Sequence, residues 1–336
     1  MPVMLRPSHS FPSGSRSPRA PRSPLRVSTV LSPLLAVITI ASVAGAQDWQ
    51  GAPAPAPDLK AALAEADAGS PAKLVGLADG GRPDAQYYAA IMFIFGRASV
   101  ARDPGRGCAY AQKAAAARAD ATYVLGECYR RGLIGPADPA KAKAAFARAD
   151  QMGYPKAKCA LGEMLLAEPA QASRGVELCR TAADAGDVDA QMKMAGLYMQ
   201  GGPVRADHAE ARKWYQKAAD RQNTEAARKL GEMYAKGDGG KADMKKAMEL
   251  WKGAEQAGDP LAPILVADQL FSELTGGKQP GPGKFAFRGG IPVADIEVIE
   301  DWYRQALERD PRPEIKKRAQ TALSVLSSFK TAAKSP

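Results

Sequence analysis

Small and large apolar positions alternate along the chain with a period of about 36 residues. In each copy an alanine is followed five positions later by glycine or alanine, and three positions after that by an aromatic residue or leucine. The central small residues, spaced 36, 36, 33, 36 and 36 apart, are Ala90, Gly126, Gly162, Ala195, Gly231 and Ala267. Because residues three, four or seven apart share one face of a helix, each copy predicts an α-helix.

A second apolar position lies eleven residues before the first alanine of the next copy. It is occupied by Tyr110, Phe146, Cys179, Tyr215 and Trp251, with Tyr303 as the displaced sixth member. Each repeat is therefore predicted to contain a second helix, whose large residue fills the gap beside the small residues of the first. Helix starts are indicated by the Asp-Pro pairs 103–104, 138–139 and 259–260 and by the capping-box spacing of Asp207 and Glu210. Helix ends are indicated by Gly132, Gly201 and Gly237.

Stacked helix pairs of this length bury a continuous core that a single pair cannot. The sequence therefore predicts an all-α fold, a right-handed α-solenoid of about six helix-turn-helix repeats over residues 84–310. Residues 58–83 are interpreted as a degenerate opening unit, and residues 311–336 as a capping helix and tail. An irregular insertion is expected at residues 275–290.

The repeats resemble a known family, the SEL-one-like repeats, a subclass of tetratricopeptide-like repeats. The resemblance covers roughly residues 84–310 and rests on the segments LGECYRRG, AGLYMQGG with ARKWYQKAA, and LGEMYAKG with AMELWKGAEQAGD. It implies an adaptor, as in envelope and exopolysaccharide-export assembly. The third copy departs from the family because it lacks the aromatic residue and the glycine-rich loop.

The first 46 residues have the pattern of a secretory signal. Five arginines precede an apolar run over residues 30–43, and Ala44-Gly45-Ala46 has the form of a cleavage site. We expect a mature chain that starts at Gln47, with a proline- and alanine-rich linker over residues 47–57. No cysteine lies near the cut, so a lipoprotein is not expected. An uncleaved membrane anchor and an organelle transit peptide are the alternatives.

The formal net charge of +10 gives little support for nucleic-acid binding. Five of these charges are the arginines of the predicted signal, which holds no acidic residue, and the rest of the chain mixes both signs. We expect no nucleic acid partner, and no integral membrane span after cleavage. The oligomeric state is not indicated.

Four cysteines form two pairs, Cys108 with Cys128 and Cys159 with Cys179, each 20 residues apart. Residues equidistant from the turn of an antiparallel helical hairpin face each other. The turn of the first hairpin lies between two repeats, and that of the second lies inside the third repeat. An export signal implies an oxidising compartment, so both pairs are predicted to form disulfides. Four free, buried thiols are the alternative.

Histidine, which Ser-His or Cys-His catalysis and multi-histidine metal sites need, is scarce. His9 lies in the predicted signal, which leaves His208 as the one other histidine, expected to be exposed near a helix start. We find no phosphate loop, nucleophile elbow or dinucleotide motif. The prediction is a protein that is not an enzyme and that has no catalytic residues, metal site or cofactor.

A recurring set of polar and aromatic positions on the first helices is the candidate protein-binding groove. If the helices pack as in tetratricopeptide repeats, these positions face the concave side and would contact a peptide or an envelope component. They are Tyr87, Tyr123, Glu127, Arg130, Arg131, Glu163, Met192, Met199, Arg228, Glu232, Lys236 and Asp268. A merely solvated face and a glycosidase-like carboxylate pair are the alternatives.

The insertion offers a second candidate contact through Phe285 and Phe287. Glycine and proline should keep this segment irregular, and long loops of solenoids often carry binding. The alternative is a loop whose phenylalanines fold back on the core.

These observations favour an exported scaffold, periplasmic or secreted, that binds another protein in envelope or exopolysaccharide-export assembly. The alternative function is a secreted hydrolase or a glycan-binding protein acting on cell-envelope polysaccharide or β-lactam-like substrates.

Overall fold

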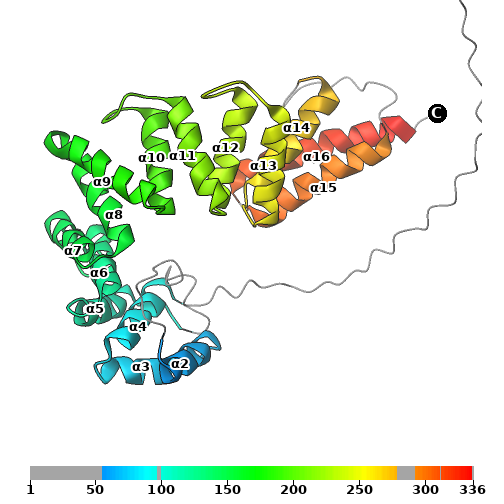
Figure 1. Cartoon of the computed structure of the whole chain (residues 1–336). Helices are drawn as coiled ribbons and strands as arrows, with labels where there is room; N and C mark the ends of the chain where they lie inside the picture. Colours follow the sequence, from blue (N-terminus) through cyan, green and yellow to red (C-terminus); the bar gives the residue numbers. More distant parts are fainter. Residues whose placement is uncertain (1–54, 97–99, 278–291, 311, 335–336) are drawn as a thin grey trace, which may run out of the picture. The chain divides into compact units, whose positions relative to one another are not determined.

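The computed structural model describes residues 55–96, 100–277, 292–310 and 312–334 as a succession of helices joined by turns (Figure 1). Across these ranges there are fifteen α-helices and one short 3-10 helix, and no strand. The expected signal segment, the start at Gln47, and Phe285 and Phe287 lie outside the described residues.

The helices follow one another in pairs that match the predicted repeats. The five regular pairs are α4 (Pro83–Phe95) with α5 (Pro104–Ala114), α6 (Ala119–Arg131) with α7 (Pro139–Gln151), α8 (Pro155–Leu166) with α9 (Ala172–Asp184), α10 (Val188–Gln200) with α11 (His208–Asp220), and α12 (Thr224–Lys236) with α13 (Met244–Gln256). The short helix η1 (Pro169–Gln171) lies between α8 and α9.

Further helices stand at both ends of this series. They are α2 (Pro57–Asp67) and α3 (Ala72–Asp79) before it, and α14 (Ala262–Thr275), α15 (Val293–Arg309) and α16 (Pro313–Lys334) after it. Each helix packs chiefly on its neighbours in the chain. The prediction of an all-α solenoid is confirmed.

Aspartate caps start most of the second helices. The side chains of Asp103 and Asp138 accept hydrogen bonds from the backbone N–H groups of Arg106 and Lys141, as the sequence predicted. Each such cap contributes about 1 kcal/mol by giving a partner to a helix-end N–H. At the ends of α6 and α12, Gly132 and Gly237 adopt the left-handed conformation, which glycine accepts without strain.

Two predicted caps differ from expectation. The helix after Asp259 begins only at Ala262, so Asp259 lies before the cap position and accepts from the N–H groups of Leu261 and Ala262. Asp207 caps α11, but its own N–H donates to the Tyr198 carbonyl, and the Glu210 carboxylate pairs with Lys213. In a capping box the Glu210 carboxylate would accept a hydrogen bond from the Asp207 N–H, but here each of these groups has the other partner just named.

The small central residues and the large residues of the second helices face each other. A Cβ atom built on Gly126 would lie 2.6 Å from the Phe146 ring, and one on Gly231 would lie 2.5 Å from Trp251. Such distances are shorter than van der Waals contact, so only glycine lets these helices approach so closely. The predicted pairing of small with large positions is confirmed in both repeats.

The third repeat holds its helices together differently. Gly162 and Gly175 bring α8 and α9 so close that a Cβ on either would lie within 2.7 Å of a backbone oxygen on the other helix. Cys179 occupies the position where other repeats have an aromatic residue, and its disulfide to Cys159 spans the same contact. A short covalent bridge thus replaces an aromatic ring where there is no room for one.

Both predicted disulfides are present. Cys108–Cys128 joins α5 to α6 and so connects two successive repeats, whereas Cys159–Cys179 joins α8 to α9 inside one repeat. The Cα atoms are 6.0 and 4.1 Å apart. The four cysteines are therefore paired as expected and are not free thiols.

The last helices form a core of their own. Tyr303 is fully buried against Ala267 and Phe271, as expected for the sixth large residue, and its ring meets that of Phe271 edge-on at 6.3 Å. Leu326 and Phe329 of α16 complete this cluster. The terminal helix thus covers the apolar face that α14 and α15 would otherwise leave open.

Candidate binding pocket

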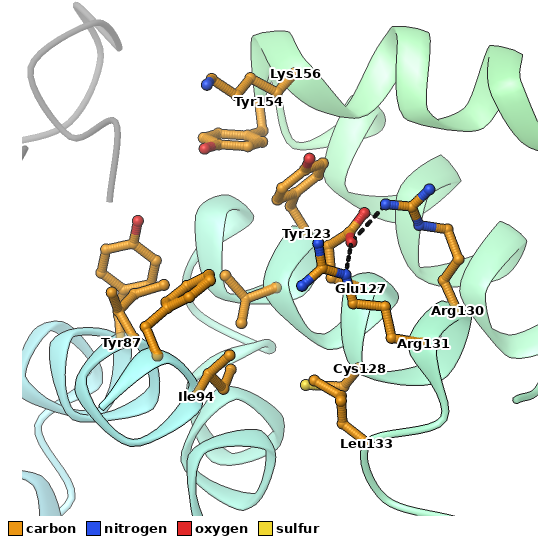
Figure 2. A pocket seen from close by; sticks show the side chains of 13 residues that line it. Tyr87, Ile94, Tyr123, Glu127, Cys128, Arg130, Arg131, Leu133, Tyr154 and Lys156 are labelled. Atoms are coloured by element: carbon orange, nitrogen blue, oxygen red, sulfur yellow. Dashed lines mark hydrogen bonds and ion pairs between the residues drawn. The ribbon is translucent and has the colours of Figure 1, made fainter. Parts of the chain in front are cut away.

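The predicted groove residues of the first two repeats gather around one cavity. Five of them, Tyr87, Tyr123, Glu127, Arg130 and Arg131, line a pocket of about 230 Å³ (Figure 2). Tyr87 comes from α4, and the other four come from α6, so residues at equivalent repeat positions meet at this pocket. The start of α8 adds Lys156, which places three successive first helices around the cavity.

Five apolar residues line the pocket. They are Ile91, Ile94, Phe95, Val124 and Leu133. Phe95, the last residue of α4, is 52% exposed, although large apolar residues in helices are usually covered. An accessible apolar cavity with an exposed aromatic residue at its edge is typical of a contact surface.

Three tyrosine rings also line the pocket. The ring centroids of Tyr123 and Tyr154 are 5.1 Å apart, and Tyr123 also meets Phe146 at 5.5 Å. Burial raises the pKa of Tyr123 above its ordinary value, with a further contribution from the nearby Glu127 carboxylate. The pKa of Tyr87 is raised by burial in the same way. Both phenols therefore stay neutral at physiological pH and offer apolar faces.

Charged side chains form the rim. One oxygen of Glu127 pairs with both Arg130 at 2.7 Å and Arg131 at 3.2 Å (Figure 2). Glu163 of α8 lies 3.8 Å from Arg130 and pairs more closely with Lys193 at 3.1 Å. The hydrogen bond to Glu127 raises the pKa of Arg130 above its usual range. This network holds three cations and two carboxylates, so it keeps an excess of positive charge.

The same repeat positions further along the chain are occupied internally. Arg228 is mostly buried and pairs with Glu232 at 2.8 Å and with Asp259 at 3.3 Å. Asp268 was expected on the groove surface, but it is only 5% exposed. Its carboxylate accepts a hydrogen bond from the Tyr303 hydroxyl at 2.9 Å and lies 2.6 Å from Arg318. The expectation fails for Asp268 because α15 and α16 cover this end.

The remaining predicted residues do not line the pocket. Met192 and Met199 are partly buried and pack on the core of the third to fifth repeats, while Lys236 is exposed at the end of α12. His208 is the first residue of α11, is 44% exposed, and lies 3.9 Å from Asp238. Its exposed position near a helix start agrees with the prediction.

Sequence reasoning missed several residues of the pocket. Phe95 and Leu133 lie at or just beyond the ends of first helices, and Tyr154 and Lys156 stand at the start of α8. The repeat pattern describes helix interiors, so it gives no weight to residues at the ends. The one available signal was Phe95 itself, an aromatic residue at a position where the other copies have polar or small residues.

In the part of the chain described, no group of three or more histidine, cysteine or acidic residues is arranged to hold a metal ion. Among the same residues, no helix combines the length and the apolar character needed to span a bilayer.

The geometry defines a helical-repeat protein with a small apolar pocket on its first helices. The Sel1 repeat matches the chain in five segments, residues 83–118, 119–148, 155–187, 188–223 and 224–259. These segments cover half of the chain, and the protein belongs to the Sel1 repeat family. Proteins of this family generally mediate protein–protein interactions and are typically not enzymes.

The chain is similar to several solved structures. A Sel1 repeat protein from Oxalobacter formigenes is 27% identical over 66% of this chain and 66% of its own, with a TM-score of 0.52. A protective antigen of uropathogenic Escherichia coli, c5321, is 21% identical over 79% of this chain and 64% of its own, with a TM-score of 0.42. The immunity protein Pa5087 from Pseudomonas aeruginosa is 19% identical over 62% and 84%, with a TM-score of 0.48.

The chain spans slightly less than two thirds of the first two of these proteins. None of the curated proteins matches it. The comparisons therefore establish the repeat family and the fold.

Proposed function

We propose that the protein is a scaffold that binds another protein through the pocket formed by α4, α6 and the start of α8. The observation that supports this proposal is the meeting of five predicted groove residues around one apolar cavity with a charged rim. A rigid helical frame, an apolar centre and a polar edge are the parts from which protein interfaces are built. In tetratricopeptide-like packing, this is also the face that turns inward.

Site-specific photo-crosslinking tests the proposal with a matched control. Phe95 and Val298 are equally exposed, at 52%, but only Phe95 lies at the pocket. A photo-crosslinking amino acid at position 95 should give a discrete protein adduct in cells, whereas the same group at position 298 should not. Equal adducts from both positions, or adducts from neither, would contradict a binding site at the pocket.

A second variant links the adduct to the pocket itself. Arg131 is half exposed, and its substitution by glutamate removes a rim cation without touching the core. The adduct formed at position 95 should fall at least several-fold in the Arg131→Glu protein. Unchanged crosslinking would mean that the partner contacts Phe95 from outside the pocket.

The protein is further proposed to act outside the cytoplasm. The signal-like sequence over residues 1–46 and the pairing of all four cysteines both support this location. Amino-terminal sequencing of the protein purified from an extracytoplasmic fraction should give Gln47. A full-length chain that stays in the cytoplasm with reduced thiols would contradict export.

The proposed partner is a component of the cell envelope, in an assembly such as exopolysaccharide export. This part of the proposal is supported by the expected location and by family resemblance alone. The partner recovered through position 95 should therefore be an envelope protein. Recovery of a cytoplasmic protein in intact cells would contradict the envelope assignment and leave the scaffold proposal standing.

A further inference from the structure

We infer that the pocket takes one large apolar side chain from an acidic segment of the partner, and that Glu127 competes with that segment for the rim arginines. The inference rests on the proposed function and specifies the chemistry of its partner. It is carried by the size of the cavity and by the arrangement of charge around it.

The cavity has room for a single anchoring side chain. Its volume of about 230 Å³ is below the range of roughly 300 to 1,000 Å³ that ligand pockets usually have. Ile91, Ile94 and Val124 line the cavity together with the ring of Tyr123, so a leucine or aromatic side chain would contact apolar atoms there. Such an anchor, buried in a pocket, is the usual centre of a protein interface.

Charge complementarity selects the residues beside that anchor. Arg130 and Arg131 lie on one side of the cavity, and Lys156, which pairs with Asp189 at 3.0 Å, lies above Tyr154 on another (Figure 2). A segment that lies across the mouth would bring the neighbours of its anchor toward these cations. Aspartate or glutamate would be attracted there, and lysine or arginine would be repelled.

Glu127 occupies the position that a partner carboxylate would take. It holds Arg130 and Arg131 with a single oxygen, and among the described residues that line the pocket it is the one that is acidic. An incoming carboxylate must therefore share or displace these two contacts. Removing the charge of Glu127 while keeping its shape should strengthen the binding of an acidic segment.

Short peptides of defined charge test this inference on the full chain. Each carries a central Leu-Phe anchor with acetylated and amidated ends, flanked on both sides by glutamate, glutamine or lysine. We expect the glutamate peptide to bind roughly tenfold more tightly than the glutamine peptide at low salt, and the lysine peptide to bind most weakly. A glutamine peptide with a free terminal carboxylate shows whether a chain end supplies the charge instead.

Two matched variants complete the test. Glu127→Gln should increase the affinity for the glutamate peptide about threefold, since exposed ion pairs are worth roughly 1.4- to 5-fold in an equilibrium constant. Glu232→Gln changes the equivalent position of the fifth repeat, where Glu232 pairs with Arg228 and Asp259 holds the same arginine. This substitution should leave the affinity for the glutamate peptide within twofold. Thermal unfolding of both variants shows whether they are folded.

The outcomes separate this inference from the proposed function. Equal or tighter binding of the lysine or glutamine peptide, preference for the free terminus, or weaker binding by Glu127→Gln would overturn the acidic-segment inference. If a crosslinked partner is found at position 95 together with any of these results, the scaffold proposal survives alone. If no peptide binds and position 95 gives no adduct, both fall.

Discussion

Glu127 and Asp268 occupy equivalent positions in the second and sixth helix pairs, yet they have different surroundings. Glu127 lies at the edge of a pocket and shares one carboxylate oxygen between two half-exposed arginines. Asp268 is buried beneath α15 and α16, where Tyr303 and Arg318 hold it. The repeat thus sets where an acidic side chain stands, and the neighbouring helices decide whether it can meet a partner.

The two regions also differ in how they are held together. Both disulfides lie in the first three repeats, and Cys128 is itself part of the pocket wall. The later repeats have ion pairs such as that of Arg228 in α12 with Asp259 in the turn before α14, and the aromatic core around Tyr303. The region that carries the pocket is therefore held by covalent bonds in addition to the packing of α2 and α3 on α4.

Removal of the disulfides should have the largest effect. Replacing both cysteines of either pair by alanine should lower the free energy of unfolding by about 3 kcal/mol, because each bridge closes a loop of similar length. Urea unfolding measures the loss. Hydrogen exchange should rise in the helices next to the missing bridge and stay unchanged in α14–α16. Faster exchange in those last helices would show that the two regions are not independent.

A pH titration should have a smaller effect, confined to the last helices. Burial raises the pKa of Asp268 to about 6, so the folded state holds a proton that the unfolded chain releases near its ordinary value of 3.8. Between these values the folded state binds more protons, and stability from this group falls as the pH rises from about 4 to 6. The change should be about 2 kcal/mol.

Asp268→Asn is the matched variant for this titration. The amide cannot ionise, but its oxygen can still accept the Tyr303 hydrogen bond. Subtracting its unfolding free energy from that of the wild type at each pH isolates Asp268. A difference that stays constant between pH 4 and 6 would contradict a raised pKa.

The smallest effect is expected at the boundary between the two regions. Gly196 stands in the fourth repeat at the position of Glu127 and Asp268, and a Cβ built on it meets no atom within 4 Å. Gly196→Ala should therefore stabilise the protein by about 0.8 kcal/mol, through the helix propensity of alanine in α10. Thermal unfolding checks the gain, and a loss of stability would show an unseen constraint at this position.

The sequence predicts the fold well because the repeat shows the same constraint six times. Glycine or alanine recurs where two helix axes approach, and the contacts of Gly126 with Phe146 and of Gly231 with Trp251 show the reason. The disulfide pairing follows from the same register, since Cys108 and Cys128 are equidistant from one turn. Periodicity identifies what the copies share.

The pocket is only partly predictable, because several of its residues lie at positions that differ from one copy to the next. Tyr123 and Glu127 stand at repeat positions and could be chosen in advance, whereas Phe95 and Tyr154 belong to helix ends that differ between copies. The burial of Asp268 depends on α16, whose packing on α14 and α15 has no counterpart in the regular repeats. Features made by a single copy leave no periodic signal.

The placement of the two disulfides has a consequence for the order in which the chain matures. Each bridge connects consecutive helices across a separation of 20 residues, so its cysteines meet once their own hairpin has formed. Short hairpins close in microseconds, far faster than thiols oxidise. Because the chain is synthesised from its amino terminus, Cys108 and Cys128 can pair before Cys159 and Cys179 are both available. Local geometry combined with the direction of synthesis therefore favours the native bonds over the crossed ones.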